Sequence, residues 1–247
     1  MHFGVYHPAM CAVRLQKSKI LAPIGEVLVV EEQQDYLTAD AFFWNVTFHE
    51  VAHGLGVKQT VNGKGTVDEA MGSEKTTWEE AKADILGLFM VNKLIEMGEI
   101  TDITKEESIA TFIAGIVRSV RFGSASSHGK ANMMCFNYME DHGAFSRNAE
   151  GKYVVDFEKS AEAIDSWAAL ILETQATGNF EFAQQYSSKN ASIREALAAD
   201  IEKVNGAGIP RDIVFEFVWY SEFHPEYDLS SRYMVGRIFL SIFVGCI

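Results

Sequence analysis

The clearest repeat of hydrophobic and polar positions lies between residues 109 and 120. Its apolar residues recur every three or four positions, as on one face of a helix; they are Ile109, Phe112, Ile113, Ile116, Val117 and Val120. Arg118 and Arg121 lie between these positions, and we expect both side chains to be turned away from the apolar face. The pattern predicts an amphipathic helix with one buried face.

Comparable patterns predict a mainly α fold, a multi-helix lobe with minor β content. Further helical segments are expected from Thr38 or Asp40 to about Gly54, from Thr76 or Thr77 to about Met97, from His128 to about Gly143, from Ile164 to Ile171 and from Ile193 to Val204. Residues 20–30 are apolar and β-branched, with Pro23 and Gly25 interrupting them, and are expected to form one short strand. Residues 153–155 are a second strand candidate.

The C-terminal part of the chain has a different character. Aromatic residues are frequent from Phe217 onward, and residues 234–247 are nearly all apolar. That run is shorter than the roughly 20 residues of a membrane-spanning helix, so no membrane span is expected. We therefore expect a helical lobe over residues 1–216 and a tail over residues 217–247. The tail has no assigned role; a docking segment, an interfacial helix and an out-of-frame extension are all compatible with it.

Composition and charge narrow the class of protein. Of the 247 residues, 48% are apolar and 22% charged, which indicates a globular chain. The net charge of −13 argues against a nucleic-acid partner and against a basic membrane-binding patch. The three scattered cysteines (Cys11, Cys135 and Cys246) predict no disulfide framework. Residues 1–15 lack the apolar core of a signal peptide, so a cytoplasmic location is expected.

The strongest chemical signal is the pentapeptide His49-Glu50-Val51-Ala52-His53, inside a predicted helix. Residues four apart on a helix lie one above the other on the same face. Two imidazoles placed in this way can bind one zinc ion, and the glutamate between them is suited to act as a general base.

A zinc site of this kind needs a third protein ligand. A histidine at position 59 would complete the HExxHxxGxxH arrangement, but Gln59 stands there. The remaining candidates are Glu79 and Glu80, 26 and 27 residues after His53 on the next predicted helix. Either carboxylate can instead interact only with the dipole of its helix. Asp84 lies one turn further on and is placed to orient a ligand. Two histidines and a carboxylate suit zinc, although cobalt or manganese can substitute.

Other motifs in the sequence are weaker evidence for a functional site. The glycine-rich residues 57–67 lack the GxxxxGK[ST] spacing of a phosphate-binding loop. Residues 127–130 fit the SxxK pattern of some serine enzymes, but the accompanying Ser-Asp-Asn and Lys-Thr-Gly elements are missing. We interpret that match as chance. The other histidines (His2, His7, His142 and His224) have no partner at ligand spacing.

The motif residues resemble a known family. Residues 49–56 (HEVAHGLG) and 79–84 (EEAKAD) look like the two zinc motifs of the dipeptidyl peptidase III family of metallopeptidases. The resemblance continues through residues 122–132 (FGSASSHGKAN) and covers roughly residues 15–216. It is closest to bacterial members described as zinc-dependent hydrolases.

The resemblance implies a role for each matching position. The implied roles are His49, His53 and Glu80 as ligands of one zinc ion, Glu50 as the catalytic glutamate, Glu79 as a support for a ligand, and His128 as the group that stabilises the transition state. Zinc would lower the pKa of a bound water toward about 7 and polarise the scissile carbonyl. Glu50 would take the proton of that water and pass it to the leaving amine. Without the resemblance, a helix N-terminal histidine bonded to a hydroxyl is the simpler interpretation of His128.

The chain departs from the family pattern in three ways. Better-known members have HExxGH, whereas this chain has the five-residue form, which keeps both imidazoles on one side of a helix. Asn132 stands where an arginine often follows the match to His128, and we expect weaker recognition of a substrate carboxylate or carbonyl. Only 48 residues precede His49, which is too few for the family's large upper lobe, so we expect the chain to be the zinc-binding lobe of a longer protein.

Two hypotheses follow. The first is a zinc exopeptidase that releases dipeptides from the amino end of oligopeptides, with an upper lobe supplied by the rest of a longer protein. The alternative is a metal-binding or peptide-binding lobe that lacks the second cleft wall and is not active alone. Glu50 favours the enzyme, because a structural zinc site usually fills its fourth position with another histidine or cysteine.

Overall fold

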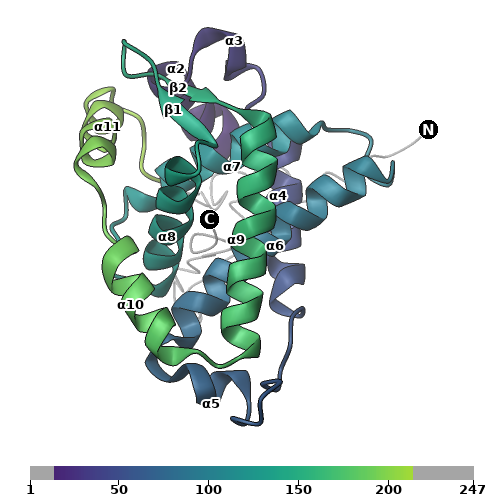
Figure 1. Ribbon diagram of the computed structural model, residues 1–247. Coiled ribbons are helices and arrows are strands. Elements are labelled where there is room, and N and C mark those ends of the chain that lie inside the picture. The colour runs from purple at the N-terminus through teal and green to yellow at the C-terminus, as the bar shows by residue number, and fades with distance from the viewer. Residues whose placement is uncertain (1–13, 214–247) are drawn as a thin grey trace, which may run out of the picture.

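The computed structural model describes residues 14–213, and apart from one two-stranded sheet their named elements are helices (Figure 1). The prediction of a mainly α fold is confirmed. In chain order the elements are the π-helix η1 (Lys17–Leu21), α2 (Ala22–Leu28), α3 (Glu31–Gln34), α4 (Ala39–His53), α5 (Val67–Met71), the 3-10 turn η2 (Gly72–Glu74), α6 (Lys75–Glu96), α7 (Lys105–Val120), α8 (Ser127–Asp141), β1 (Phe145–Arg147), β2 (Tyr153–Val155), α9 (Phe157–Ala176), α10 (Phe180–Asn190) and α11 (Glu195–Gly206). The tail predicted over residues 217–247 lies outside the described residues.

Helix α6 is the centre of the fold. It packs against α4, α7, α8 and α9, and residues 80–88 are buried without interruption. A helix that is buried on all sides belongs to the interior rather than to the surface. Near its start, Trp78 packs against aromatic rings of α9 and α10 in tilted and edge-to-face geometry, and its indole nitrogen donates to Ser187 Oγ at 3.1 Å. Side chains of the first half of α6 are therefore held in fixed positions.

The predicted helix boundaries are close to those observed for α4. The Thr38 hydroxyl accepts a hydrogen bond from the Ala41 amide at 3.2 Å and caps the helix, which ends at His53 before Gly54. Helix α6 begins at Lys75 after the turn η2, without a threonine cap. The short helix α5 and helix α10 were not predicted. Among the described residues, no helix is both long and apolar enough to cross a lipid bilayer.

The strand predicted over residues 20–30 is wrong. This segment forms η1 and α2, with Ile20, Ile24 and Leu28 buried at the four-residue spacing of a helix face. Pro23 stands in the first turn of α2, which follows η1 directly. Val29, after the end of α2, is extended and forms an isolated bridge to Tyr153. The burial of one helix face therefore decides the structure of this segment, although its β-branched residues favour a strand.

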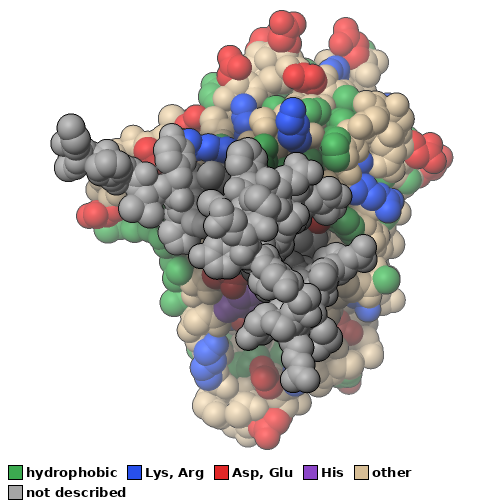
Figure 2. Space-filling view, turned by 180° about the vertical axis from the view of Figure 1, so that it is seen from behind, with side chains coloured by type: hydrophobic (Ala, Val, Ile, Leu, Met, Phe, Trp, Pro, Cys, Tyr) green, Lys and Arg blue, Asp and Glu red, His purple; other side chains and the backbone are tan. Residues whose placement is uncertain are grey.

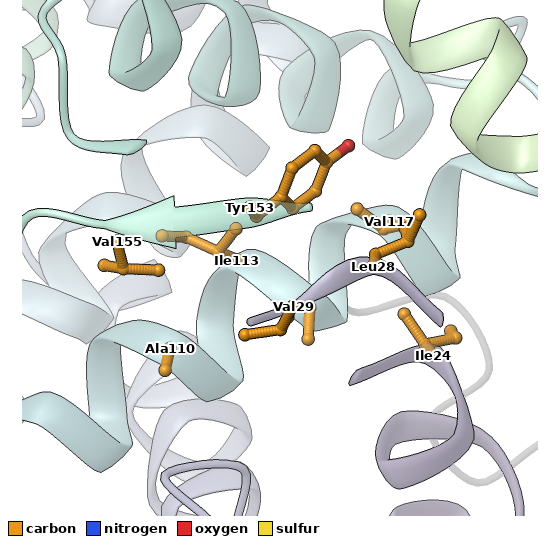
Figure 3. A pocket seen from close by; sticks show the side chains of 9 residues that line it. Ile24, Leu28, Val29, Ala110, Ile113, Val117, Tyr153 and Val155 are labelled. Atoms are coloured by element: carbon orange, nitrogen blue, oxygen red, sulfur yellow. The ribbon is translucent and has the colours of Figure 1, made fainter. Parts of the chain in front are cut away.

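The predicted strand at residues 153–155 is present as β2, paired antiparallel with β1. Tyr153 and Val155 close a small pocket between the hairpin, α2 and α7 (Figure 3). Its other lining residues are Ile24, Leu28, Val29, Ala110, Ile113, Ala114 and Val117. The Tyr153 hydroxyl donates instead to Asp200 Oδ2 at 2.7 Å, so the pocket is an apolar packing gap rather than a binding site.

Arg118 and Arg121, which we expect to be turned away from the apolar face of α7, are nevertheless buried. They are 1% and 4% exposed, because α11 and the segment after it cover this end of α7. Arg121 donates to Asn205 Oδ1 and to two main-chain carbonyls of residues 209 and 210, at 2.6–3.0 Å. Arg118 pairs with Asp212 at 3.6 Å. Both guanidinium groups thus fix the C-terminal end of the described chain.

Candidate metal centre

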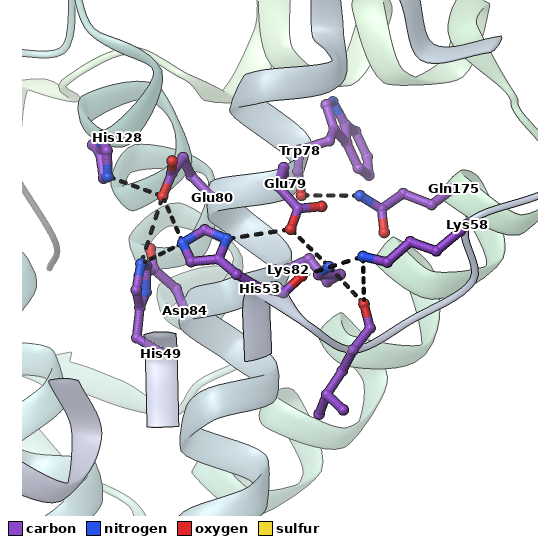
Figure 4. A network of polar contacts seen from close by, with 11 residues as sticks. His49, His53, Lys58, Trp78, Glu79, Glu80, Lys82, Asp84, His128 and Gln175 are labelled. Carbon is purple, nitrogen blue, oxygen red and sulfur yellow. Dashed lines mark hydrogen bonds and ion pairs between the residues drawn. The ribbon is translucent and has the colours of Figure 1, made fainter. Parts of the chain in front are cut away.

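Three side chains from α4 and α6 converge at one point (Figure 4). His49 and His53 lie one turn apart on α4, and their Nε2 atoms are 3.2 Å apart. Glu80 of α6 places its Oε2 3.6 Å from His49 Nε2 and 3.7 Å from His53 Nε2. His49 and Glu80 are buried, whereas the side chain of His53 is 30% exposed. The cluster is therefore open on the His53 side, and Figure 2 shows a histidine surface beside acidic side chains on the rear face.

Each imidazole is held from its other nitrogen by a carboxylate. Asp84 Oδ1 lies 2.8 Å from His49 Nδ1, and Glu79 Oε1 lies 3.2 Å from His53 Nδ1. A carboxylate can only accept, so these contacts assign the proton of both neutral imidazoles to Nδ1. Both Nε2 atoms then present lone pairs. This is the arrangement in which carboxylates orient metal-binding histidines.

The donor atoms fit a metal ion. Two Nε2 lone pairs that face each other at 3.2 Å repel unless a cation lies between them. Tetrahedral zinc with bonds of about 2.0–2.2 Å separates neighbouring donor atoms by about 3.3–3.6 Å. The three measured separations, 3.2, 3.6 and 3.7 Å, bracket that range. The three residues thus form a cluster able to hold one metal ion.

Two solved structures have a fold similar to that of the chain. Dipeptidyl-peptidase III from Caldithrix abyssi matches 83% of the chain with a TM-score of 0.78 and 30% sequence identity. The enzyme from Corallococcus sp. strain EGB matches 83% of it with a TM-score of 0.77 and 31% identity. This likeness in fold and sequence supports the dipeptidyl-peptidase III family. It spans 39% and 38% of the length of these two family members.

A plant protein is also similar to the chain in sequence. Nudix hydrolase 3 of Arabidopsis thaliana is 34% identical over 198 residues, which are 78% of the chain and 26% of the plant protein. A match to about a quarter of that protein does not assign its named activity to the matched part. No protein-family model matches the chain.

His128 lies beside Glu80. It is the second residue of α8, whose first turn is capped by Ser126. His128 Nε2 is 2.9 Å from Glu80 Oε2, and its ring is stacked over that of His49 with centroids 6.5 Å apart. Burial raises the pKa of Glu80, but the hydrogen bonds and positive charge of His128 and His49 in their protonated forms outweigh it and hold the pKa at about 2. Glu80 therefore stays ionised.

Glu50 is exposed on α4, directly after His49 and one turn before His53. On a helix this position lies beside the ligand face rather than on it. The structure thus leaves Glu50 next to the metal cluster and open to solvent.

Two residues of the network were not identified from the sequence. The buried Lys82 donates to Glu79 Oε1 at 2.8 Å, and Asn132 donates from Nδ2 to Asp84 Oδ2 at 2.9 Å. Asn132 is 1% exposed, and its side chain supports Asp84 from inside the protein. Weaker substrate recognition through the replacement of an arginine at this position stays a prediction. The only sequence signal for Lys82 was a lysine inside a helical stretch that the apolar pattern marks as buried.

Proposed function

We propose that this chain is the zinc-binding part of a peptide hydrolase that releases dipeptides from the amino end of oligopeptides. The observation that carries the proposal is the pair of Nε2 atoms 3.2 Å apart, with both Nδ1 atoms held by carboxylates and Glu80 opposite them. Structural neighbours named dipeptidyl-peptidase III support the peptide class of substrate.

His49, His53 and Glu80 would hold the zinc ion, with Asp84 and Glu79 orienting the two imidazoles. When bound, zinc supplies Lewis-acid chemistry that activates water and polarises a peptide carbonyl. The carboxylate of Glu50 accepts a proton from the attacking water and delivers it to the leaving amine nitrogen.

His128 is proposed to turn its Nε2 from Glu80 Oε2, which it contacts in this structure, to the oxyanion that forms on the substrate carbonyl. Its side chain is 32% exposed, so the ring is accessible at the open side of the cluster. Donors of this kind contribute about 10²–10³ in rate.

A second candidate function is a metal- and peptide-binding lobe that is inactive alone. It is favoured by one observation, that the chain spans 38–39% of the solved family members. In this proposal an upper lobe from the rest of a longer protein provides the second wall of the cleft.

Elemental analysis of the purified chain tests the metal site. We expect about one zinc per chain, lost in the His53→Ala and Glu80→Ala variants. His142→Ala is the matched control, because His142 lies at the end of α8 and bonds only to the Tyr138 carbonyl among the contacts described. A wild-type chain that holds no zinc after reconstitution would contradict the proposed zinc site.

Hydrolysis of a dipeptidyl arylamide then separates the two functions. The enzyme hypothesis expects turnover by the zinc-loaded chain that is lost in Glu50→Gln, with zinc content unchanged. Full zinc content with no turnover by the wild type would favour the inactive lobe.

A further inference from the structure

Lys82 is a buried cation next to the metal cluster. Its side chain is 2% exposed, and its Nζ donates to Glu79 Oε1 and to the Leu55 carbonyl, both at 2.8 Å. A buried charge is costly unless it is paired and hydrogen-bonded. Lys82 is therefore held in one geometry, with its charge directed at one oxygen of Glu79.

That oxygen is the one that meets His53. Glu79 Oε1 is shared between Lys82 Nζ at 2.8 Å and His53 Nδ1 at 3.2 Å. Glu80, the next residue, faces the Nε2 atoms of both histidines instead. Two adjacent carboxylates of the same chemistry thus occupy different places around His53, and only Glu79 contacts the lysine among the described contacts.

We propose that Lys82 is a positioning residue that fixes Glu79 against His53 Nδ1 and leaves Glu80 as the third metal ligand. The inference rests on the proposed zinc site. It makes the support of the two histidines asymmetric, because a cation holds the carboxylate behind His53, whereas the neutral amide of Asn132 holds Asp84 behind His49.

Lys82 also ties the end of α4 to α6. The Leu55 carbonyl that it binds lies two residues after His53. The chain then turns at Gly56, which has φ of 82°, and a Cβ there would lie 3.3 Å from Lys82 Cδ. The same lysine thereby holds the helix end from which His53 projects and the carboxylate that orients its ring.

Lys58 provides a matched control. Its ammonium donates to the His53 carbonyl at 3.2 Å and to the Leu55 carbonyl at 3.5 Å, but it lies on the exposed side and has no contact with Glu79 among those described. Both lysines thus donate to the Leu55 carbonyl, but among the described contacts only Lys82 also donates to the Glu79 carboxylate.

The test is zinc affinity, measured by competition with a chromophoric chelator on the full chain. We expect Lys82→Met to weaken zinc binding about 10–100-fold, as loss of a ligand-supporting group typically does. Lys58→Met should stay within about twofold of the wild type, and Lys82→Arg should restore most of the affinity. Circular dichroism of the metal-free variants checks that each is folded.

Glu79→Gln keeps Lys82 in place and gives a second route if Lys82→Met does not fold. It should weaken binding to a similar extent, and the double variant should lose little more, because both changes break one contact. Three results would overturn the role of Lys82 and leave the proposed zinc site standing. They are wild-type affinity in Lys82→Met, equal losses in Lys82→Met and Lys58→Met, and additive losses in the double variant. A wild-type chain that binds no zinc would instead overturn the proposed function.

Discussion

Gly87 of α6 faces the backbone of His49 on α4 so closely that a Cβ at position 87 would lie 2.8 Å from the His49 amide nitrogen. The contact is with main-chain atoms, which cannot turn aside as a flexible side chain can. The absence of a side chain at Gly87 is thus what allows the two ligand-bearing helices to approach each other at His49.

We expect Gly87→Ala to separate α4 from α6, to destabilise the fold by about 1–3 kcal/mol and to weaken zinc binding. The overpacking works against a gain of about 1 kcal/mol in helix propensity. Urea denaturation and chelator competition measure the two effects.

Gly206→Ala is the control, because a Cβ there meets no atom within 4 Å in α11. It should be neutral or slightly stabilising. Equal behaviour of the two alanine variants would contradict the close-approach argument.

Asn132 supports Asp84 from the interior of α8, and its removal leaves a buried carboxylate oxygen without that donor. We expect Asn132→Ala to weaken zinc binding about tenfold and to destabilise the fold by about 1–3 kcal/mol. Asn132→Asp should be worse, because it places a second carboxylate against Asp84. Chelator competition resolves the series.

Asn137→Ala is the control that distinguishes a loss of zinc affinity from a general loss of stability. Asn137 is also buried in α8, but its amide donates to the carbonyls of Asn190 and Ser192. This variant should lose stability with zinc affinity unchanged. A parallel loss of affinity would show that any cavity in α8 disturbs the site.

The ionised Glu80 makes the stability of the metal-free protein depend on pH. Its pKa of about 2 in the folded chain lies below the ordinary value of 4.5. The carboxylate therefore stabilises the fold fully above about pH 4.5, and this contribution is lost as the pH falls toward 2. The free energy of unfolding of the wild type should exceed that of Glu80→Gln at pH 5.5, and the gap should shrink by pH 3.

Urea denaturation in the presence of a chelator measures that gap. Glu162→Gln, on the exposed face of α9, is the matched control and should follow the wild type. A gap between wild type and Glu80→Gln that is independent of pH would show that the carboxylate is not held by the histidines.

The sequence could predict the helices that carry the candidate ligands because their signals are local. Thr38 and Gly54 mark the two ends of α4, and the spacing of His49 and His53 needs nothing beyond helical geometry. The choice of the next helix for the third ligand rested on the same reasoning, and Glu80 does lie opposite the histidines.

The remaining features depend on partners far away in the chain. Arg121 is buried because residues 205–210 fold over it, and no pattern within α7 indicates that. Ile20 to Leu28 is helical because one face packs into the core, although its composition favours a strand. Asn132 reaches Asp84 from 48 positions further along the chain, a pairing that spacing alone cannot predict.

The placement of the candidate ligands along the chain has a consequence for synthesis. A nascent chain that has emerged as far as the end of α6 already carries His49, His53 and Glu80 with the carboxylates that orient the imidazoles. The donors on α8, Asn132 and His128, emerge only later. On the ribosome, the three ligands are thus available to a metal ion before the residues that stiffen and cover them, and α8 completes a centre that the first half of the chain begins.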